Sequence, residues 1–230
     1  MKYFLLFILA STQYYVNAQT ATDSVMLLDG KTFRGNIIEI SENFVTLNSY
    51  SSAGKDQGVI NVDKYRVFSY HKGGSETVLY QQSDAPENFL SIDQTRSAAL
   101  GSYDAINHYE TKAVFYSSVA ITFGFCIFDT YLTKSRRDKI GNPELKAGFF
   151  GRSPSIWPIA SVLVLPISFA IPSTKVRAKN LVNGVRGDNY YYSGFNTTAR
   201  QRRSFSALKG SAAGLVLGFG SYFIFHPNPF

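Results

Sequence analysis

The chain has very few of the residues on which covalent cross-links and most metal sites depend. Its 230 residues include one cysteine, Cys126, and three histidines. A single cysteine excludes a disulfide within the chain and a cysteine-rich zinc site. Around the histidines and the scattered carboxylates there is no spacing typical of a nucleophilic triad, a carboxylate pair or a two-metal site. We therefore predict no catalytic site, no bound metal and no cofactor, and we expect a protein that is not an enzyme.

Charged residues are scarce as well, at 17% of the chain, whereas hydrophobic residues make up 45% and aromatic residues 15%. This composition excludes an intrinsically disordered chain. The net charge of +7 is distributed unevenly. Residues 19–110 carry seven Lys and Arg against twelve Asp and Glu, whereas residues 111–230 carry fifteen against four. The positive charge therefore belongs to the second half of the chain.

Residues 1–18 have the pattern of a secretory signal peptide. Lys2 precedes the apolar run 4–10, and a small residue, Ala18, stands at a site that suits signal peptidase. Seven apolar residues are too few to cross a membrane, which takes about 20. We therefore predict cleavage after Ala18 and export of the residues that follow. The alternative is an uncleaved signal anchor, which would also export residues 20–110.

Residues 19–80 consist of short segments of alternating apolar and polar residues, separated by turns such as Asp29-Gly30. This alternation indicates half-buried strands. The segments lie at 25–27, 32–40, 44–47, 59–62, 65–70 and 77–80. Such closely spaced short strands are typical of a small antiparallel β-barrel, for which we predict an SH3-like or Sm-like topology. Gly35, in the middle of the second segment, predicts a bend or a β-bulge.

Residues 81–112 are predicted to form a helical linker. Ser91 to Asp93 can cap a short helix over 94–100, and Gly101 can end it. Ser102 can cap a second helix that continues toward the apolar half of the chain.

A motif at the start of the predicted barrel carries a resemblance to a known family. The pattern Asp-x-Val-x-Leu-x-Asp-Gly followed by Gly-x-Ile-x-Glu-Ile, here Asp23 to Ile40, resembles the start of uncharacterised secreted and envelope proteins of the Bacteroidota. The linker resembles theirs in part. It keeps Arg96, Gly101, Asp104 and Ala105, but has Thr95, Ala98 and Ser102 where Met, Tyr and Glu would be expected. The resemblance covers about half of the chain and implies an envelope protein, without implying an activity.

Three long apolar runs in the second half predict membrane-spanning helices. They lie at about 113–133, 153–174 and 210–226. The first run contains Asp129, which we expect near the far membrane interface. The second contains Pro166, which is expected to kink it. The third carries Gly210, Gly214 and Gly218 at four-residue spacing, which predicts close packing against another helix.

The charged residues between the runs leave two topologies open. Segment 134–152 is basic, as a cytoplasmic loop should be. Segment 175–209 is also basic, and a second full span would place it on the exported side, against that charge bias. Either the proline-rich run is re-entrant and both basic segments lie inside, or three spans exist and the second segment departs from the bias.

A basic cluster precedes the third run and consists of Arg200, Arg202, Arg203 and Lys209. We predict that it faces anionic lipid headgroups, where each charge contributes about 1 kcal/mol. Nucleic acid is the less favoured partner. Tyr190 to Tyr192 could stack on bases, but they fit an aromatic belt at a membrane edge equally well.

Together these patterns predict an α+β membrane protein, with a small antiparallel β-barrel, a helical linker and two to three transmembrane helices. We expect it in the cell inner membrane, with its N-terminal domain in the periplasm. The expected function is non-enzymatic: the barrel docks a partner protein or a second copy, and membrane lipid surrounds the helices. The alternative is a small transport component in which the Pro166 helix, Asp129 and the glycine face line a path.

Overall fold

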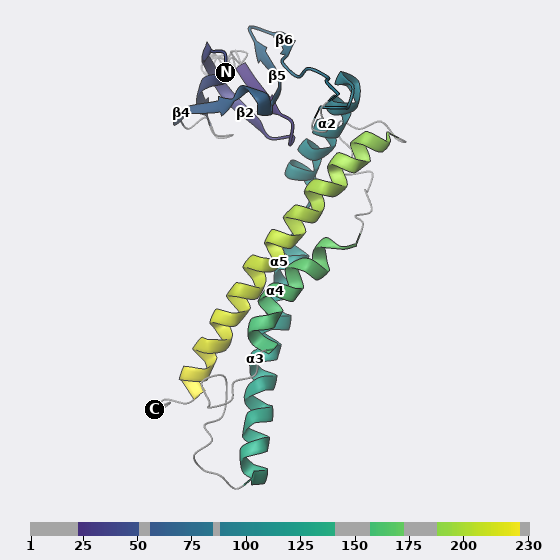
Figure 1. Ribbon diagram of the computed structural model, residues 1–230. Coiled ribbons are helices and arrows are strands. Elements are labelled where there is room, and N and C mark those ends of the chain that lie inside the picture. The colour runs from purple at the N-terminus through teal and green to yellow at the C-terminus, as the bar shows by residue number, and fades with distance from the viewer. Residues whose placement is uncertain (1–22, 51–55, 85–87, 141–156, 173–187, 226–230) are drawn as a thin grey trace, which may run out of the picture. The chain divides into compact units, whose positions relative to one another are not determined.

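The computed structural model describes residues 23–50, 56–84, 88–140, 157–172 and 188–225 (Figure 1). In these residues the chain forms six strands and four α-helices. They divide into two compact units, residues 1–92 and residues 93–230. The predicted signal peptide lies outside the described residues.

The first unit is an antiparallel six-stranded sheet in the order β4-β3-β2-β1-β5-β6. The strands are β1 Asp23–Leu27, β2 Thr32–Ile40, β3 Phe44–Tyr50, β4 Asp56–Asp63, β5 Val67–Lys72 and β6 Ser75–Val78. The 3-10 turn Lys64–Arg66 joins β4 to β5, which lies four places away in the sheet. Four flat strand spacings would measure about 19 Å, whereas three residues reach about 10 Å. The sheet must therefore be strongly curled.

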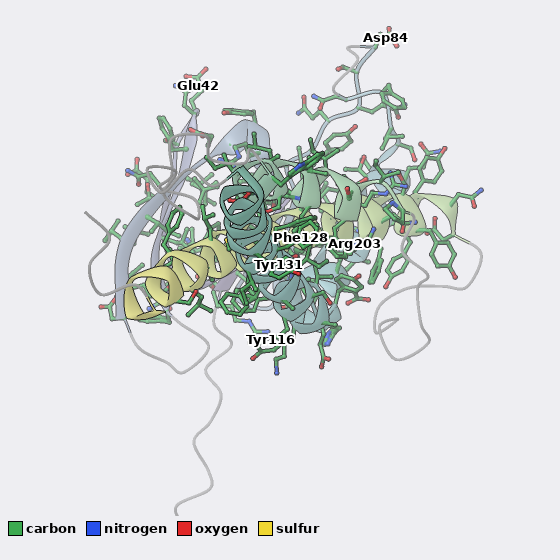
Figure 2. The ribbon with its side chains drawn as sticks, turned by 90° about the horizontal axis from the view of Figure 1, so that it is seen from below. Glu42, Asp84, Tyr116, Phe128, Tyr131 and Arg203 are labelled. Atoms are coloured by element: carbon green, nitrogen blue, oxygen red, sulfur yellow. The ribbon has the colours of Figure 1, made fainter. Side chains whose placement is uncertain are left out.

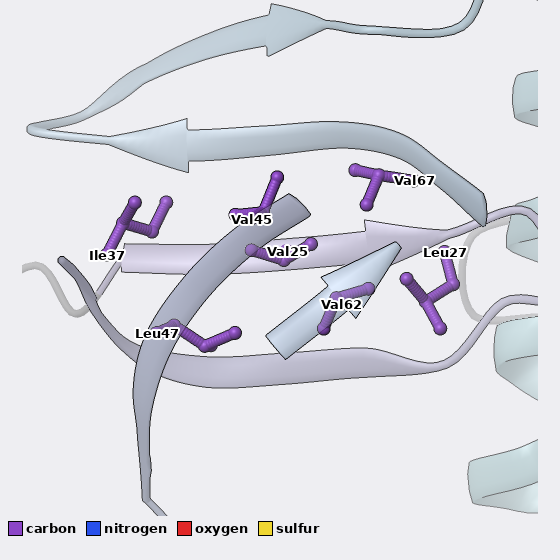
Figure 3. Packing of buried hydrophobic residues seen from close by; sticks show 7 residues of the cluster. All are labelled: Val25, Leu27, Ile37, Val45, Leu47, Val62 and Val67. Carbon is purple, nitrogen blue, oxygen red and sulfur yellow. The ribbon is translucent and has the colours of Figure 1, made fainter. Parts of the chain in front are cut away.

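The curled sheet surrounds one apolar core, which Figure 3 shows at close range. Its seven buried residues are Val25, Leu27, Ile37, Val45, Leu47, Val62 and Val67. They come from five strands and alternate with exposed residues, as the period of a half-buried strand requires. Full burial of each such side chain contributes about 1.5–3 kcal/mol to folding.

The antiparallel strands are confirmed, but the sheet is open. Within the described part of the chain, β4 and β6 each pair with one neighbour only, so no ladder closes a barrel. The predicted closed barrel is therefore corrected to an open, curled sheet. The short turn after β4 brings the chain to β5, and β6 then extends the sheet beyond β5 instead of pairing with β4.

Gly35 allows β2 and β3 to approach closely, although it is not the bulge that the sequence predicts. A Cβ at Gly35 would collide with the backbone carbonyl of Asn48. The irregularity in register lies further along β2, between Ile37 and Glu39. The glycine is thus needed for strand proximity rather than for a change of register.

The second unit contains the helices α2 Ile92–His108, α3 Lys112–Ile140, α4 Trp157–Ala170 and α5 Asn189–Phe225. The two short helices predicted at 94–100 and after Ser102 are in fact one helix, α2. This helix does not end at Gly101. Glycine is needed at that position because it packs against the backbone of Tyr191 on α5, where any side chain would collide. The basic residues before Gly210, which we had not predicted to be helical, form the first half of α5.

Helix α5 lies against α2 with its first half and against α3 with its second. Gly101 meets Tyr191, Ser206 donates a hydrogen bond to the Thr111 carbonyl, and Gly210 meets Phe115. Along these contacts the residue numbers increase in the same direction on α5 as on α2 and α3. Helices α2 and α3 therefore run parallel to α5. Helix α4 runs the opposite way.

The direction of α4 follows from two contacts near its ends. Ser161 bonds Thr122 in the middle of α3, and the Pro172 carbonyl, just after α4, accepts a bond from Arg203 of α5. Arg203 precedes Gly210, the first glycine against α3. The chain therefore goes down α3, back along α4 and down α5. Helix α4 continues through Pro166, which is buried.

Candidate functional site

The glycine face predicted on α5 lies directly against α3. A Cβ at Gly214 would lie 2.6 Å from the Val119 carbonyl oxygen, and one at Gly218 would lie 2.6 Å from the Cβ of Cys126. Gly210 is equally tight against Phe115. The residues of α3 that face these glycines are also small and also four apart: Ser118, Thr122 and Cys126. Each helix thus presents a small-residue face to the other, as close helix packing requires.

Hydroxyl groups in this interface are buried and hydrogen-bonded. Thr122 is fully buried, and its hydroxyl accepts a 3.1 Å bond from Ser161 of α4. Ser161 also lies 2.7 Å from the Pro158 carbonyl, and Ser118 donates to the Val114 carbonyl over 2.8 Å. Serine and threonine can serve as helix-to-helix contacts inside an apolar bundle in this way, because they bond without adding bulk.

Asp129 lies on the same face of α3, one turn beyond Cys126, and is 3% exposed. The sequence predicts that it lies near a membrane interface, and the side chains of Lys134 and Arg136, its predicted partners there, are outside the described part of the structure. A buried carboxylate on a long apolar helix is costly and usually marks a functional position. Asp129 thus places a buried carboxylate in this interface.

The outward side of the same helices carries large apolar side chains. They are exposed on all three elements: Tyr116, Ile127 and Phe128 on α3, Leu163, Val164 and Ile167 on α4, and Val216 and Leu217 on α5. Figure 2 shows Tyr116 and Phe128 among the side chains of this unit. Among the described residues one helix, α3, contains a stretch with the length and composition to cross a membrane, Lys112–Asp129, whereas α4 has 14 residues. In α3, α4 and α5, small residues therefore face the neighbouring helices, and large apolar residues face outward.

The four residues of the predicted basic cluster differ in their surroundings. The Arg202 guanidinium donates a 2.7 Å bond to the Ala105 carbonyl of α2, and burial lowers its pKa. Arg203 is 9% exposed and binds the Pro172 carbonyl. These two residues thus direct their charge to backbone carbonyls of the bundle, while contact of the cluster with lipid headgroups stays a prediction. Arg200 is half-buried, whereas Lys209 is exposed.

A polar contact between α2 and α5 was missed from the sequence. The Tyr191 hydroxyl donates a 2.6 Å hydrogen bond to Asp104, and both side chains are almost fully buried. Burial and the adjacent carboxylate raise the pKa of Tyr191. Beside this pair Gly101 and Gly194 bring the two backbones together, and Ser102 bonds the Gly194 carbonyl.

Asp188 caps the start of α5 next to this contact. Its carboxylate accepts bonds from the backbone N–H groups of Tyr190 and Tyr191, at 2.9 and 3.2 Å. A hydrogen bond from Ser97 and these two N–H groups hold its pKa below the usual value. Aspartate is among the residues preferred at the N-cap of a helix, so Asp188 was a signal from which this start could have been found.

No group of three His, Cys, Asp or Glu residues that could hold a metal ion occurs in the residues that the structure describes. His71 Nε2 and Glu76 Oε1 form a weak ion pair at 4.0 Å between β5 and β6. Comparison with models of protein families, with characterised proteins and with solved structures found no match for this chain.

Proposed function

We propose that the protein is a non-enzymatic cell-envelope protein whose helices α3, α4 and α5 lie in the inner membrane and whose N-terminal sheet serves as a periplasmic docking module. The SH3-like or Sm-like relationship of that sheet belongs to the same proposal. The observation that carries the membrane assignment is the burial pattern of the three helices. Val216 is 68% exposed, whereas Gly214 and Gly218 on the same helix are buried.

This pattern is physically sensible in lipid. Water would make the exposure of these Ile, Leu, Val and Phe side chains unfavourable, by roughly 25 cal/mol for each Å² of apolar surface. Lipid tails are as apolar as these side chains, so helices in a bilayer gain from close backbone packing between small residues instead. The glycine, serine and threonine contacts between α3, α4 and α5 provide that packing.

The helix directions support three passes through the membrane rather than a re-entrant second run. Helices α3 and α5 are parallel, so the chain between them has to return to the side from which α3 started. The contact between Arg203 and the Pro172 carbonyl lies at that side. The end of α5 is then on the opposite side of the membrane from α2, and the first half of α5 is on the same side as α2.

Three passes place a basic segment on the exported side, against the usual charge bias. Arg202 and Arg203 give a reason for this departure. Both guanidinium groups are held by backbone carbonyls of the bundle, so these two charges have a structural role in joining α5 to α2 and to the end of α4.

Reporter fusions after Ser173, after Lys209 and at Phe230 test the topology. A reporter active only in the periplasm is expected to work after Ser173 and Lys209 and to fail at Phe230. The re-entrant model predicts the reverse at all three positions. If the three fusions all behave alike and alkaline carbonate releases the protein from membranes, the membrane assignment is wrong.

The docking role follows from the exported position of the sheet unit. Cross-linking of intact cells through residues 20–110, followed by purification in mild detergent, is expected to capture a partner protein or a second copy. A protein that remains a monomer, with nothing attached through these residues, contradicts the docking role and leaves the membrane assignment unaffected.

Asp129 favours a second candidate, a small membrane transport component. It is a buried carboxylate on the α3 face that also carries Thr122, which bonds α4. Transport through this interface requires that Asp129→Asn change a measured ion or solute flux in reconstituted vesicles. Unchanged fluxes with Asp129→Asn and with Pro166→Ala would remove the basis of this candidate.

A further inference from the structure

Helix α5 continues well beyond the part that packs against α3. It is one helix from Asn189 to Phe225, and Gly210 begins its contact with α3 (Figure 1). Residues 189–225 contain no proline, which is the usual cause of a sharp kink. The first half of α5, residues 189–209, therefore continues the axis of the second half. At 1.5 Å per residue this first half is about 30 Å long.

The outward side of α5 changes in character along the helix. Ser193, Thr197 and Gln201 lie four residues apart, and all three are polar and exposed. The next residue at this spacing, Phe205, is 64% exposed, and Val216 further along is 68% exposed. Polar side chains thus face outward in the first half of α5, and large apolar side chains are exposed after Gln201.

Two exposed lysines lie near this change. Lys209 directly precedes Gly210, which faces Phe115 of α3, and Lys112 is the first residue of α3. The two lysines therefore lie at nearly the same level along the parallel helices α3 and α5. Lysine side chains near the end of a span extend to the membrane interface. In the proposed membrane arrangement this level is the edge of the lipid on the side of α2.

Helix α2 packs against the first half of α5, beyond that edge. Gly194 of α5 meets the backbone of Ala98, where a side chain would collide, and its carbonyl accepts a 3.2 Å hydrogen bond from Ser102. Along the helix axis Gly194 lies about 22 Å from Lys209, at 1.5 Å per residue. Because α2 runs parallel to α5, its first residue, Ile92, lies still further from the edge than Ala98.

We propose that α2 and the first half of α5 form an upright spacer on the exported side, which holds the start of α2 at least about 20 Å from the lipid surface. The chain enters α2 from the sheet unit, so this raised end is the point to which the sheet is tethered. The proposal rests on the proposed function, because it takes α3, α4 and α5 to lie in the membrane. A tether at this height makes the sheet available to a partner protein dissolved in the periplasm.

The alternative is that α2 and the first half of α5 lie flat on the lipid, as amphipathic interfacial helices do. That arrangement requires a broad apolar face and a sharp bend of α5 next to Lys209. The exposed side of the first half instead carries Ser193, Thr197 and Gln201, and α5 is continuous across Lys209. These observations favour an upright pair of helices.

Quenching of a fluorescent dye by nitroxide groups on the lipid headgroups of both leaflets tests the spacer, because this quenching acts only over short distances. The dye is attached to Asp93→Cys or, as the matched control, to Asn107→Cys, in a Cys126→Ala background of the full-length chain in vesicles. Both positions are exposed on α2 and lie about 21 Å apart along it. We expect strong quenching at Asn107→Cys and a loss of that quenching at Asp93→Cys. The pair Lys209→Cys and Asn189→Cys repeats the test on α5, with quenching expected only at Lys209→Cys.

Equal quenching at Asp93→Cys and Asn107→Cys, high or absent, overturns the spacer, and so does stronger quenching at Asp93→Cys. Carbonate extraction of the same vesicles separates this failure from a failure of the proposed function. A chain that stays in the vesicles with both positions quenched lies along the lipid surface, which contradicts only the spacer. A chain that carbonate releases, with neither position quenched, contradicts the membrane assignment and the spacer with it.

Discussion

The hydroxyl of Tyr191 and the carboxylate of Asp104, 87 residues apart in the chain, share a 2.6 Å hydrogen bond in the buried contact between α5 and α2. Tyr191→Phe removes the hydroxyl that donates this bond, while the Asp104 carboxylate stays buried in the contact. We expect a loss of about 1–3 kcal/mol in the free energy of unfolding. Thermal unfolding of the detergent-solubilised protein measures it, with the more exposed Tyr190→Phe as the control that should change little.

The same contact predicts a dependence on pH in the alkaline range. The folded protein keeps the Tyr191 proton to higher pH than the unfolded chain does, because its pKa is raised. The stabilisation is therefore complete below the ordinary tyrosine pKa of about 10 and decreases as the pH rises above it. Unfolding measured from pH 8 to pH 11 should show this loss, and Tyr191→Phe should lose less over that range. Identical slopes for the two proteins would count against the assignment.

Gly214 is predicted to be indispensable for the packing of α5 on α3. Gly214→Ala places a methyl group 2.6 Å from the Val119 carbonyl and 3.0 Å from the Thr122 Cβ. We expect a destabilisation of about 1–3 kcal/mol, as for other overpacked sites. Gly220→Ala is the matched control, because nothing lies within 4 Å of its Cβ position and alanine favours a helix. Equal thermal stability of the two variants would show that the close contact does not matter.

Arg203 distinguishes a structural role of the basic cluster from a lipid-facing one. Arg203→Ala leaves the Pro172 carbonyl without its charged donor, and we expect a cost of about 1.5–3 kcal/mol that does not depend on lipid composition. Lys209→Ala, at an exposed position, should change stability by less than about 0.5 kcal/mol. If Arg203→Ala is harmless in neutral detergent but weakens binding to vesicles that contain anionic lipid, the lipid-facing interpretation is correct.

The sequence predicted those parts of the fold that depend on local pattern. Alternation placed the strands around Val25 and Leu47, and the spacing of Gly210, Gly214 and Gly218 identified the face that packs on α3. It could not show that the sheet is open, because alternation marks the faces of a strand and does not say whether β4 meets β6.

Contacts between polar segments that are distant in the chain could not be predicted from the sequence. Residues 189–209 have no apolar run, so nothing local marked them as the partner of α2. Gly101 was predicted as a helix stop because a helix end and a close helix contact both favour glycine. Only the position of Tyr191 opposite Gly101 separates the two explanations.

Accessibility of Val216 to a charged, water-soluble maleimide tests most directly whether the small-inside, large-outside bundle lies in lipid. The chain carries Val216→Cys in the Cys126→Ala background, and the membranes are opened so that both sides are reachable. Because the Val216 side chain is 68% exposed on the bundle, only surrounding lipid can keep the reagent away. We expect no labelling at Val216→Cys and rapid labelling of Gln201→Cys, an exposed position on the first half of α5. Equal labelling of both would contradict the account, because the apolar face of the helices would then be in contact with water.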